Sequence, residues 1–409
     1  MGSFSIALTG LNADSTALNT IGNNLANLNT TAFKDQTATF SDLFYQQVGS
    51  TGSGDALQQG LGTQVSSTST DFSEGTLTTT DSSTDMALEG NGFFVVNANG
   101  EQELTRAGNF QLDNEGNLTT TSGANVMGYP AVNGTVNAGG TLVPLQVPIG
   151  ETQSAQASTT FSLTGNLSSS APVGDTFSTP ITMYDSLGTS HVATVSFTKT
   201  ASDQWGYSVT LPSGDETGTP TGNTGTLTFD TSGNLVSPSS NVSGISFPGM
   251  ADGAADMSLN WNLFSSSGNA TLSQTSSASA SSATAQNGFA SGTYEGFTVD
   301  TSGLVTAQFS NGETQTIGQV AVANVANAEG LTDAGNNNYL TTAASGTAAV
   351  GTAGNGGLGS IDDDALESSN VNISTEFTNL IVAQRAFEAN SKTITTFDTL
   401  TQETIDMIR

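Results

Sequence analysis

The sequence predicts a mainly β, multidomain protein with paired terminal α-helices. Three observations predict this class: an apolar heptad near the N-terminus, a second heptad over residues 371–409, and short alternating strands with turn signals between them. We expect the helices to form a coiled-coil-like core and the middle to form domains of the β-sandwich or β-barrel type. A chain of 409 residues is too long for one ordinary core, which agrees with several domains.

The first predicted element is an amphipathic helix over residues 1–30. Phe4, Leu11, Leu18 and Leu25 recur at the seven-residue spacing of a helical seam. This apolar stripe is narrow, so one helix cannot bury it alone. The positions that we predict to pack between subunits are Phe4, Leu8, Leu11, Leu18, Ile21, Leu25 and Leu28.

The last predicted element is a long helix within residues 371–409, which contain neither Gly nor Pro although the chain has 47 Gly. Its heptad also includes Ile408. The predicted packing positions are Ile373, Phe377, Leu380, Phe387, Ile394 and Phe397. The natural partner of each terminal helix is the other one, and further copies of the chain could cover the remaining apolar surface. Such a contact repeats without closing and produces a helical assembly.

The middle of the chain has the pattern of β-structure. Residues 191–197 and 205–211 alternate apolar and polar side chains, and turn signals recur between such runs. Stretches 49–70 and 341–360 are rich in small polar residues and are expected to be flexible. The expected domains are an inner helical core (1–30 and 368–409), a connecting segment (31–70 and 347–367), an inner β domain (71–148 and 288–346) and an inserted outer β domain (149–287).

Composition excludes several classes of partner. The chain has 36 acidic and 6 basic residues and a net charge of −30, so nucleic acid and anionic membrane surfaces are disfavoured as partners. No apolar run is long enough for a membrane-spanning helix, and we expect no membrane insertion. The N-terminus lacks the pattern of a cleaved secretory signal, which predicts export by a route that cleaves none. With no Cys, no disulfide can form.

Catalytic patterns are missing from the sequence. The one His, His191, is expected to be an exposed strand residue, and no zinc-binding spacing can exist without Cys. The acidic runs at 113–117 and 362–364 are interpreted as turns rather than calcium loops. We therefore expect no catalytic, cofactor or metal site and no enzyme activity. A glycosidase that uses two carboxylates is the enzymatic alternative, although no pair of acids is marked for it.

The two ends resemble the signatures of bacterial flagellar rod and hook proteins. The N-terminal pattern ends in "NNLANLNTTAFK", with Ala32 where the family usually has Gly, and the C-terminal one is "IVAQRAFEANSKTI". The matching N-terminal motif residues are Asn23, Asn24, Leu25, Ala26, Asn27, Asn29, Thr30, Phe33 and Lys34. The middle, including "MYDSLGTSHVATVSF", is similar to the hook protein family.

This resemblance implies a structural subunit that polymerises into the curved tubular hook, the flexible universal joint that transmits torque from rod to filament. It implies type III export, an extracellular location in the flagellar hook, no cofactor, and three partners besides further copies: the distal rod protein, the hook cap and the hook–filament junction protein. The alternatives are a distal rod or hook-associated axial protein and, in a different class, an acidic β-rich surface adhesin.

Overall fold

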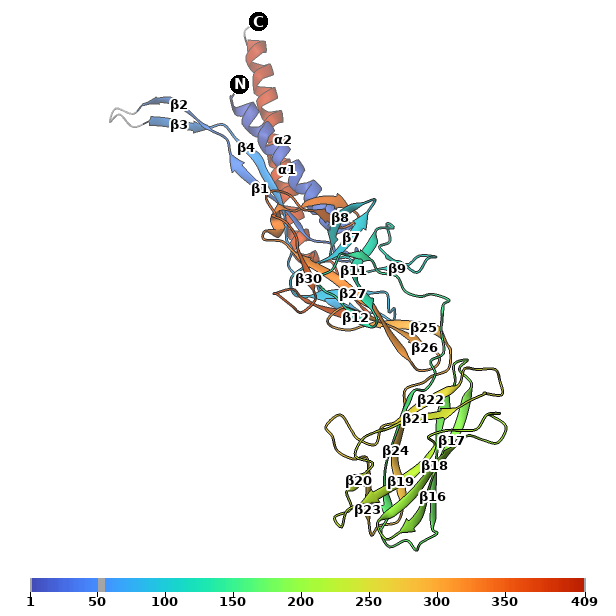
Figure 1. Cartoon of the computed structure of the whole chain (residues 1–409). Helices are drawn as coiled ribbons and strands as arrows, with labels where there is room; N and C mark the ends of the chain where they lie inside the picture. The colour runs from blue at the N-terminus through green and yellow to red at the C-terminus, as the bar shows by residue number, and fades with distance from the viewer. Residues whose placement is uncertain (1, 51–55, 408–409) are drawn as a thin grey trace. The chain divides into compact units, whose positions relative to one another are not determined.

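The computed structural model describes residues 2–50 and 56–407 (Figure 1). Expectations for residue 1, for residues 51–55 and for Ile408 lie outside the described residues. The chain divides into two compact units, which are described separately. Unit 1 comprises Met1–Ile149, Phe297–Ala307 and Gln315–Arg409, and unit 2 comprises Gly150–Gly296 and Gln308–Thr314. The prediction of a mainly β, multidomain chain with terminal helices is confirmed.

Two antiparallel helices form the ends of unit 1: α1 (Gly2–Ala26) and α2 (Ile373–Met407), which lie side by side in Figure 1. Helix α1 ends earlier than expected, because the Asn/Thr stretch after Ala26 forms turns. Helix α2 begins at an N-cap, where Asn372 Oδ1 accepts hydrogen bonds from the backbone N–H of Ser374 (3.0 Å) and Thr375 (3.2 Å).

Two antiparallel ribbons follow α1 in unit 1. Strand β1 (Gln36–Asp42) pairs with β4 (Thr63–Thr70), and β2 (Tyr45–Ser50) pairs with β3 (Ala56–Gly60). The expectation of a flexible stretch over 49–70 is therefore wrong for its described strand residues. Strands β1 and β4 are rich in Thr, whose β-branched side chain favours extended backbone although it gives no hydrophobic signal. The second expected flexible stretch, 341–360, likewise contains a strand, β30.

The β-structure of unit 1 combines one main sheet with two small ones. Within unit 1 the main sheet has the order β27-β11-β7-β8-β29-β28, with β30 on β27. The small sheets β5–β32 and β6–β31 pair the outgoing chain with the returning chain. The strands are β5 (Leu77–Thr79), β6 (Met86–Glu89), β7 (Phe93–Ala98), β8 (Glu101–Thr105), β9 (Gln111–Leu112), β10 (Leu118–Thr119), β11 (Asn125–Val132), β12 (Thr135–Val136), β13 (Val143–Pro144), β27 (Thr314–Asn324), β28 (Thr332–Gly335), β29 (Asn338–Leu340), β30 (Ala349–Thr352), β31 (Ser360–Asp363) and β32 (Ala365–Glu367). A 3₁₀ turn, η1 (Ala328–Gly330), precedes β28.

Unit 2 is a sandwich of two five-stranded sheets around one apolar core. The first sheet has the order β16-β17-β18-β19-β20, and the second has β21-β22-β15-β23 with β24 also on β15. The strands are β14 (Thr152–Gln153), β15 (Thr160–Ser168), β16 (Thr176–Tyr184), β17 (Ser190–Ala201), β18 (Gln204–Thr210), β19 (Thr224–Phe229), β20 (Leu235–Ser237), β21 (Val242–Phe247), β22 (Met257–Trp261), β23 (Leu272–Thr275) and β24 (Ala280–Gln286). Two further strands, β25 (Gly292–Val299) and β26 (Leu304–Phe309), contain residues of both units.

The core of unit 2 follows from the alternation seen in the sequence. Ala193, Val195 and Phe197 on β17 face inward and are fully buried, as are Trp205 and Val209 on β18. Rings from both sheets meet in this core, where Tyr207 of β18 lies edge-on to Trp261 of β22 with ring centroids 5.1 Å apart. Because successive strand residues point to opposite faces, the predicted alternation places one apolar row against the other sheet.

His191 on β17 differs from its sequence expectation. It is buried rather than exposed, and its two ring nitrogens lie 2.8 Å from Asp215 Oδ2 and 3.0 Å from Asp185 Oδ2. Burial disfavours the charged ring, but the two carboxylates outweigh it and raise the pKa of His191. The expected turn at 113–117 does form, since Asp113 Oδ1 accepts from the backbone N–H of Glu115 and Asn117, both at 2.8 Å.

Candidate functional site: the helix pair and its junction

The helix pair exposes much of its apolar surface in the single chain. Of the predicted packing residues, only Ile21 is buried. Those that are partly buried are Leu11, Leu18, Leu25, Leu28, Leu380, Phe387, Ile394 and Phe397. Those that are exposed are Phe4, Leu8, Ile373 and Phe377. Their packing between subunits stays a prediction, and their incomplete burial leaves room for a partner.

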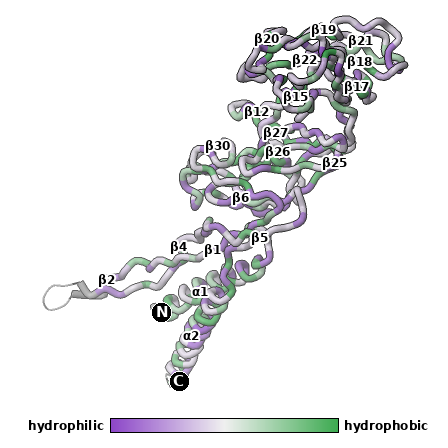
Figure 2. Tube along the Cα trace, turned by 90° about the horizontal axis from the view of Figure 1, so that it is seen from below, coloured by the Kyte–Doolittle hydropathy of each residue, from purple (hydrophilic) through white to green (hydrophobic). Residues whose placement is uncertain are grey.

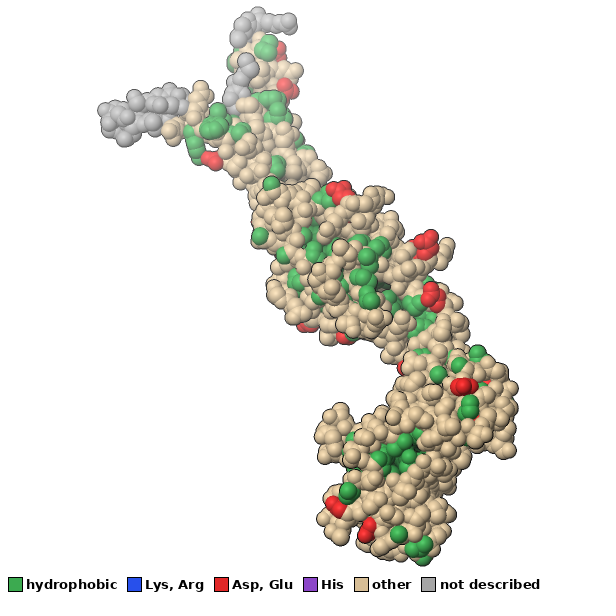
Figure 3. Space-filling view, in the orientation of Figure 1, with side chains coloured by type: hydrophobic (Ala, Val, Ile, Leu, Met, Phe, Trp, Pro, Cys, Tyr) green, Lys and Arg blue, Asp and Glu red, His purple; other side chains and the backbone are tan. Residues whose placement is uncertain are grey.

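Hydropathy and surface views show the same feature. Hydrophobic positions recur between hydrophilic ones along both helices in Figure 2, and hydrophobic side chains reach the surface over the helices and the β1–β4 ribbon in Figure 3. Further exposed apolar side chains include Ile381 and Val382 on α2 and Phe40 on β1. A groove of about 350 Å³ lies between α1, α2 and β1, lined in part by Ile21, Phe40 and Val382.

The two helices approach closely where Gly10 of α1 faces Asn390 of α2. A Cβ atom on residue 10 would lie 2.7 Å from Asn390 Nδ2, so a larger residue would displace the Asn390 side chain. Asn390 Nδ2 also donates to Asp14 Oδ2 at 2.8 Å. A small residue and one polar contact therefore fix how the pair is aligned.

The turn after α1 is built by residues of the N-terminal motif. Asn27 Nδ2 donates to the Asn23 carbonyl at 3.0 Å, and Thr30 Oγ1 donates to Asn27 Oδ1 at 3.1 Å. Ala32 has φ +55°, so the left-handed backbone that Gly usually serves is kept without Gly. The Ala32 N–H donates to the Glu367 carbonyl at 2.8 Å, which joins this turn to the returning chain.

Asn24 connects α1, the turn and α2. Its buried side chain donates from Nδ2 to Asp35 Oδ1, to the Gln36 carbonyl (2.8 Å) and to Glu376 Oε2 (3.2 Å). Its Oδ1 accepts from the Gln36 N–H at 3.1 Å. A shortened or charged side chain at this position could not make all of these bonds, which explains an Asn here.

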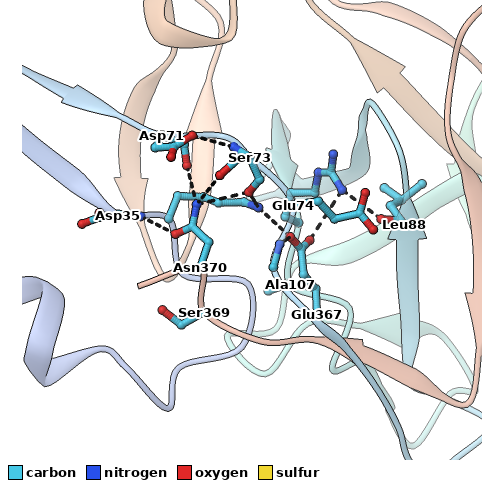
Figure 4. A network of polar contacts seen from close by, with 12 residues as sticks. Asp35, Asp71, Ser73, Glu74, Leu88, Ala107, Glu367, Ser369 and Asn370 are labelled. Carbon is cyan, nitrogen blue, oxygen red and sulfur yellow. Dashed lines mark hydrogen bonds and ion pairs between the residues drawn. The ribbon is translucent and has the colours of Figure 1, made fainter. Parts of the chain in front are cut away.

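A buried ion pair lies at the centre of the junction (Figure 4). Lys34 Nζ lies 2.6 Å from Glu367 Oε1, and both side chains are completely inaccessible to solvent. Lys34 also donates to the Ser73 carbonyl at 2.7 Å, and the Gly75 N–H donates to Glu367 Oε1 at 2.8 Å. Burial lowers the pKa of Lys34, and the attraction of Glu367 opposes this effect. Such a pair requires good geometry because desolvation is costly.

Arg106 forms the other side of this junction. Its Nη1 lies 3.5 Å from Glu367 Oε2, an ion-pair contact too long for a good hydrogen bond. Nη1 also donates to the Leu88 carbonyl at 3.0 Å, Nη2 donates to the Gly90 carbonyl, and the guanidinium lies 5.7 Å from the centre of the Phe93 ring. Burial lowers the pKa of Arg106, while Glu367 acts in the opposite direction.

Asn370 completes the junction (Figure 4). Its Oδ1 accepts from the Asp35 N–H at 2.7 Å, and its Nδ2 donates to the carbonyls of Asp71 (2.8 Å) and Ser73 (3.2 Å). Three stretches that are far apart in sequence therefore share one polar network: 31–36, 71–75 and 367–370.

Of the motif residues, the structure brings Asn24, Phe33 and Lys34 into this buried junction. Asn27 and Thr30 form the turn, whereas Asn23, Ala26 and Asn29 are exposed. Sequence reasoning missed Glu367, Arg106 and Asn370. No local pattern singled out Glu367 or Arg106, since Glu367 follows three aspartates and Arg106 follows two glutamates in the sequence.

Four family models match this chain. They are described as flagella basal body rod protein (residues 4–34), flagellar hook protein FlgE/F/G D1 domain (87–168), flagellar basal body protein FlaE D2 domain (168–289) and flagellar basal body rod FlgEFG protein C-terminal (363–407). The terminal models cover most of α1 and α2. The D2 model covers most of the sandwich.

Full-length relatives decide between rod and hook. The flagellar hook protein FlgE of Salmonella typhimurium is 36% identical over 422 residues, which cover 99% of this chain and 100% of that protein. The chain belongs to the flagellar hook protein family. The FlgE proteins of Escherichia coli (35% identical, 99% of each chain) and Treponema pallidum (32% identical, 98% of each chain) are similar over the same extent.

Membership in the hook protein family makes this chain a structural subunit of the flagellar hook, and neither a rod protein nor an adhesin is favoured. The crystal structure of Helicobacter pylori flagellar hook protein FlgE2 shares the fold, with a TM-score of 0.56 at 15% identity. That match covers 71% of this chain and 100% of the other. Among the described residues, neither helix is long and apolar enough to cross a membrane.

Proposed function

We propose that copies of this chain polymerise into the curved tube of the hook by packing their α1–α2 pairs against one another. The observation that supports this most directly is the apolar stripe of the pair, of which a single chain buries little. Phe4, Leu8, Ile373 and Phe377 are each between 42% and 51% exposed. Burying these side chains between copies would remove apolar surface from water, which is the main favourable contribution to such an association.

The buried junction gives this proposal a mechanical element. Torque that reaches the helix pair must pass into the β-structure of unit 1 through residues 27–36 and 367–372. These two segments are connected directly by the Lys34–Glu367 ion pair and by the hydrogen bonds of Asn24 and Asn370. Because buried polar networks are satisfied in one arrangement only, the junction would transmit load without slipping.

The polar surface of unit 2 is proposed to supply contacts that change as the hook bends. Outward positions of β17 and β18 are mostly Thr, Ser and Gly. Wet polar contacts can be exchanged with little change in free energy, since water replaces each lost hydrogen bond. This division assigns tube stiffness to the helices and adaptability to the inserted β domain.

Partners and location follow from the same proposal. The distal rod protein, the hook cap and the hook–filament junction protein would meet the ends of the tube. The subunit would be exported through the flagellar type III apparatus, act outside the cell and retain its N-terminus. Sequencing the N-terminus of purified hooks tests the last point, because a start beyond residue 2 would reveal cleavage.

Electron microscopy of cells whose only copy lacks residues 1–28 tests the proposed role of α1. Basal bodies with complete rods but no hook or filament are expected, with full-length protein restoring curved hooks. Loss of the rod as well would place the protein further inward. Intact curved hooks in the deletion strain would contradict the assembly role of α1.

A further inference from the structure

One cluster in unit 2 has no part in the helix pair or its junction. It contains Asp185 after β16, His191 on β17, Asp215 in the loop after β18, and Asp252 in the loop between β21 and β22. One ligand atom each from Asp185, His191 and Asp252 lies within 4.8 Å of the other two. The β16–β17 hairpin, which carries Asp185 and His191, and the distant loop that carries Asp252 therefore bring one imidazole and two carboxylates close together.

The imidazole of His191 is held in a fixed orientation. Asp215 Oδ2 lies 2.8 Å from Nδ1, and the ring is buried against solvent. A carboxylate on Nδ1 holds a proton on that nitrogen, while Asp185 Oδ2 faces Nε2 at 3.0 Å, so a metal ion that binds Nε2 would take the place of a proton between Nε2 and Asp185. In metal sites, a carboxylate commonly accepts a hydrogen bond from one ring nitrogen of a histidine while the other ring nitrogen binds the ion.

Asp185 is fixed as well and is suited to the role of an anionic ligand. Its side chain is completely buried, and its Oδ1 accepts from the backbone N–H of Leu187 (2.8 Å) and Thr189 (2.9 Å). These bonds occupy Oδ1, and Oδ2 lies 3.0 Å from His191 Nε2. That separation is compatible with two ligands that share one ion at about 2.0–2.2 Å each.

Charge at the cluster is not balanced by the protein. Three carboxylates converge on one imidazole. Of the chain's six Lys and Arg residues, Lys34, Arg106 and Lys199 are buried elsewhere, and the exposed ones in the described part of the chain, Arg385 and Lys392, lie on α2. Asp252 is exposed, so the space between the carboxylates is open to ions from solvent. Figure 3 shows acidic side chains over the face that it draws.

We propose that Asp185, His191 and Asp252 bind one divalent transition-metal ion, with Asp215 orienting the imidazole. One nitrogen and two carboxylate oxygens, completed by water, form a donor set that suits Zn²⁺. The ion would tie the 185–189 turn to the loop that carries Asp252. Binding to the folded state alone would stabilise unit 2 in proportion to the logarithm of the ion concentration.

Isothermal titration calorimetry of the chelator-treated full chain with zinc chloride tests this proposal. Excess magnesium chloride in the buffer saturates weak sites on the acidic surface. We expect one zinc ion per chain and a long-range ¹H–¹⁵N spectrum in which Nε2 of the single His shifts on binding. Asp252→Asn, at an exposed position where the amide oxygen can still accept from the Ala254 N–H, should weaken binding at least about tenfold, and Asp215→Asn should weaken it about 10- to 100-fold.

The matched control is Glu313→Gln, at an exposed turn of the same unit, which should bind zinc like the unaltered chain. Thermal unfolding shows whether each variant is folded before titration. Three results would overturn the proposal: no zinc binding above the magnesium background, binding that Asp252→Asn leaves unchanged, or an Nε2 signal that does not move.

Discussion

The sandwich of unit 2 and the helix pair of unit 1 differ in how completely each buries its apolar side chains within one chain. The sandwich buries large residues from both of its sheets, including Trp205, Trp261 and Phe197, in one contiguous core. Among their described apolar side chains, the two helices bury only Ala7, Ala13, Ile21 and Ala383. The sandwich closes its core within a single copy, whereas the helix pair leaves apolar surface that we propose neighbouring copies cover.

The difference has a simple geometric origin. Each strand of a sandwich places every second side chain against the opposing sheet, so two sheets close a core between them. Two antiparallel helices touch along one line only, and side chains on the flanks of that line stay open to solvent. A pair becomes fully packed when further helices cover the flanks, as in a bundle or a helical polymer.

The largest expected effect is on assembly. If assembly did not change, the proposed difference between the helix pair and the sandwich would be wrong. Leu18→Asp or Phe387→Asp should abolish hooks, because each places a charge where copies are proposed to pack. Electron microscopy and sedimentation of purified subunits measure this. The variant subunits should keep the unfolding temperature of unit 2. Hooks of normal number in either variant would show that the partly buried stripe has no role between copies.

The next effect concerns the closed core. Phe197→Ala in β17 should cost about 3–5 kcal/mol of unfolding free energy of unit 2, because it opens a cavity beside Trp261. Urea unfolding followed by Trp fluorescence measures it, since both Trp residues of the chain lie in this core. Val192→Ala, at an exposed position of the same strand, should change stability by less than about 0.5 kcal/mol. Equal effects of the two variants would contradict a single dominant core.

A third substitution tests what the buried junction contributes to stability, apart from the helix pair and the sandwich. Lys34→Met removes the shorter of the two ion-pair contacts of Glu367 and should cost about 3 kcal/mol, because the buried carboxylate keeps only the 3.5 Å contact to Arg106 and the bond from the Gly75 N–H. Lys392→Met, at an exposed position of α2, is the control and should be nearly neutral. Urea unfolding monitored by circular dichroism measures the loss in unit 1. If both lysines behave alike, the junction does not hold the two ends of the chain together.

The smallest expected effect depends on pH. Burial, Glu376 and Asp71 raise the pKa of Asp35, so the folded state holds this proton more tightly than the unfolded state. Asp35 therefore reduces stability at neutral pH, and the penalty disappears as pH falls through its folded pKa toward the unfolded value near 3.8. Asp35→Asn should be more stable than the unaltered chain at pH 7 by a few tenths of a kcal/mol, with a smaller difference near pH 4. A difference that stays constant in urea unfolding between these pH values would exclude this cause.

Much of the architecture was readable from local patterns. Heptads located both helices to within a few residues, and the absence of Gly and Pro was a second signal for α2. The alternation over 191–197 placed Ala193, Val195 and Phe197 in a core. The predicted helix extended to residue 30, whereas α1 ends at Ala26, because the Asn and Thr side chains of the motif bond to one another and to the backbone at the helix end. Thr-rich strands in 36–70 escaped the same reasoning, since they carry no hydrophobic period.

The sequence by itself determined the elements, the charge and the family signature of this chain, because periodicity and composition act over a few neighbouring residues. Only the tertiary structure decided which polar residues meet. Lys34 and Glu367 are 333 residues apart in sequence. The ring of His191 is buried, and its two nitrogens face Asp185 and Asp215 on neighbouring loops. Such pairings depend on how the tertiary fold brings distant segments together. The partner of a buried charge can therefore be identified from the structure but not from the local sequence.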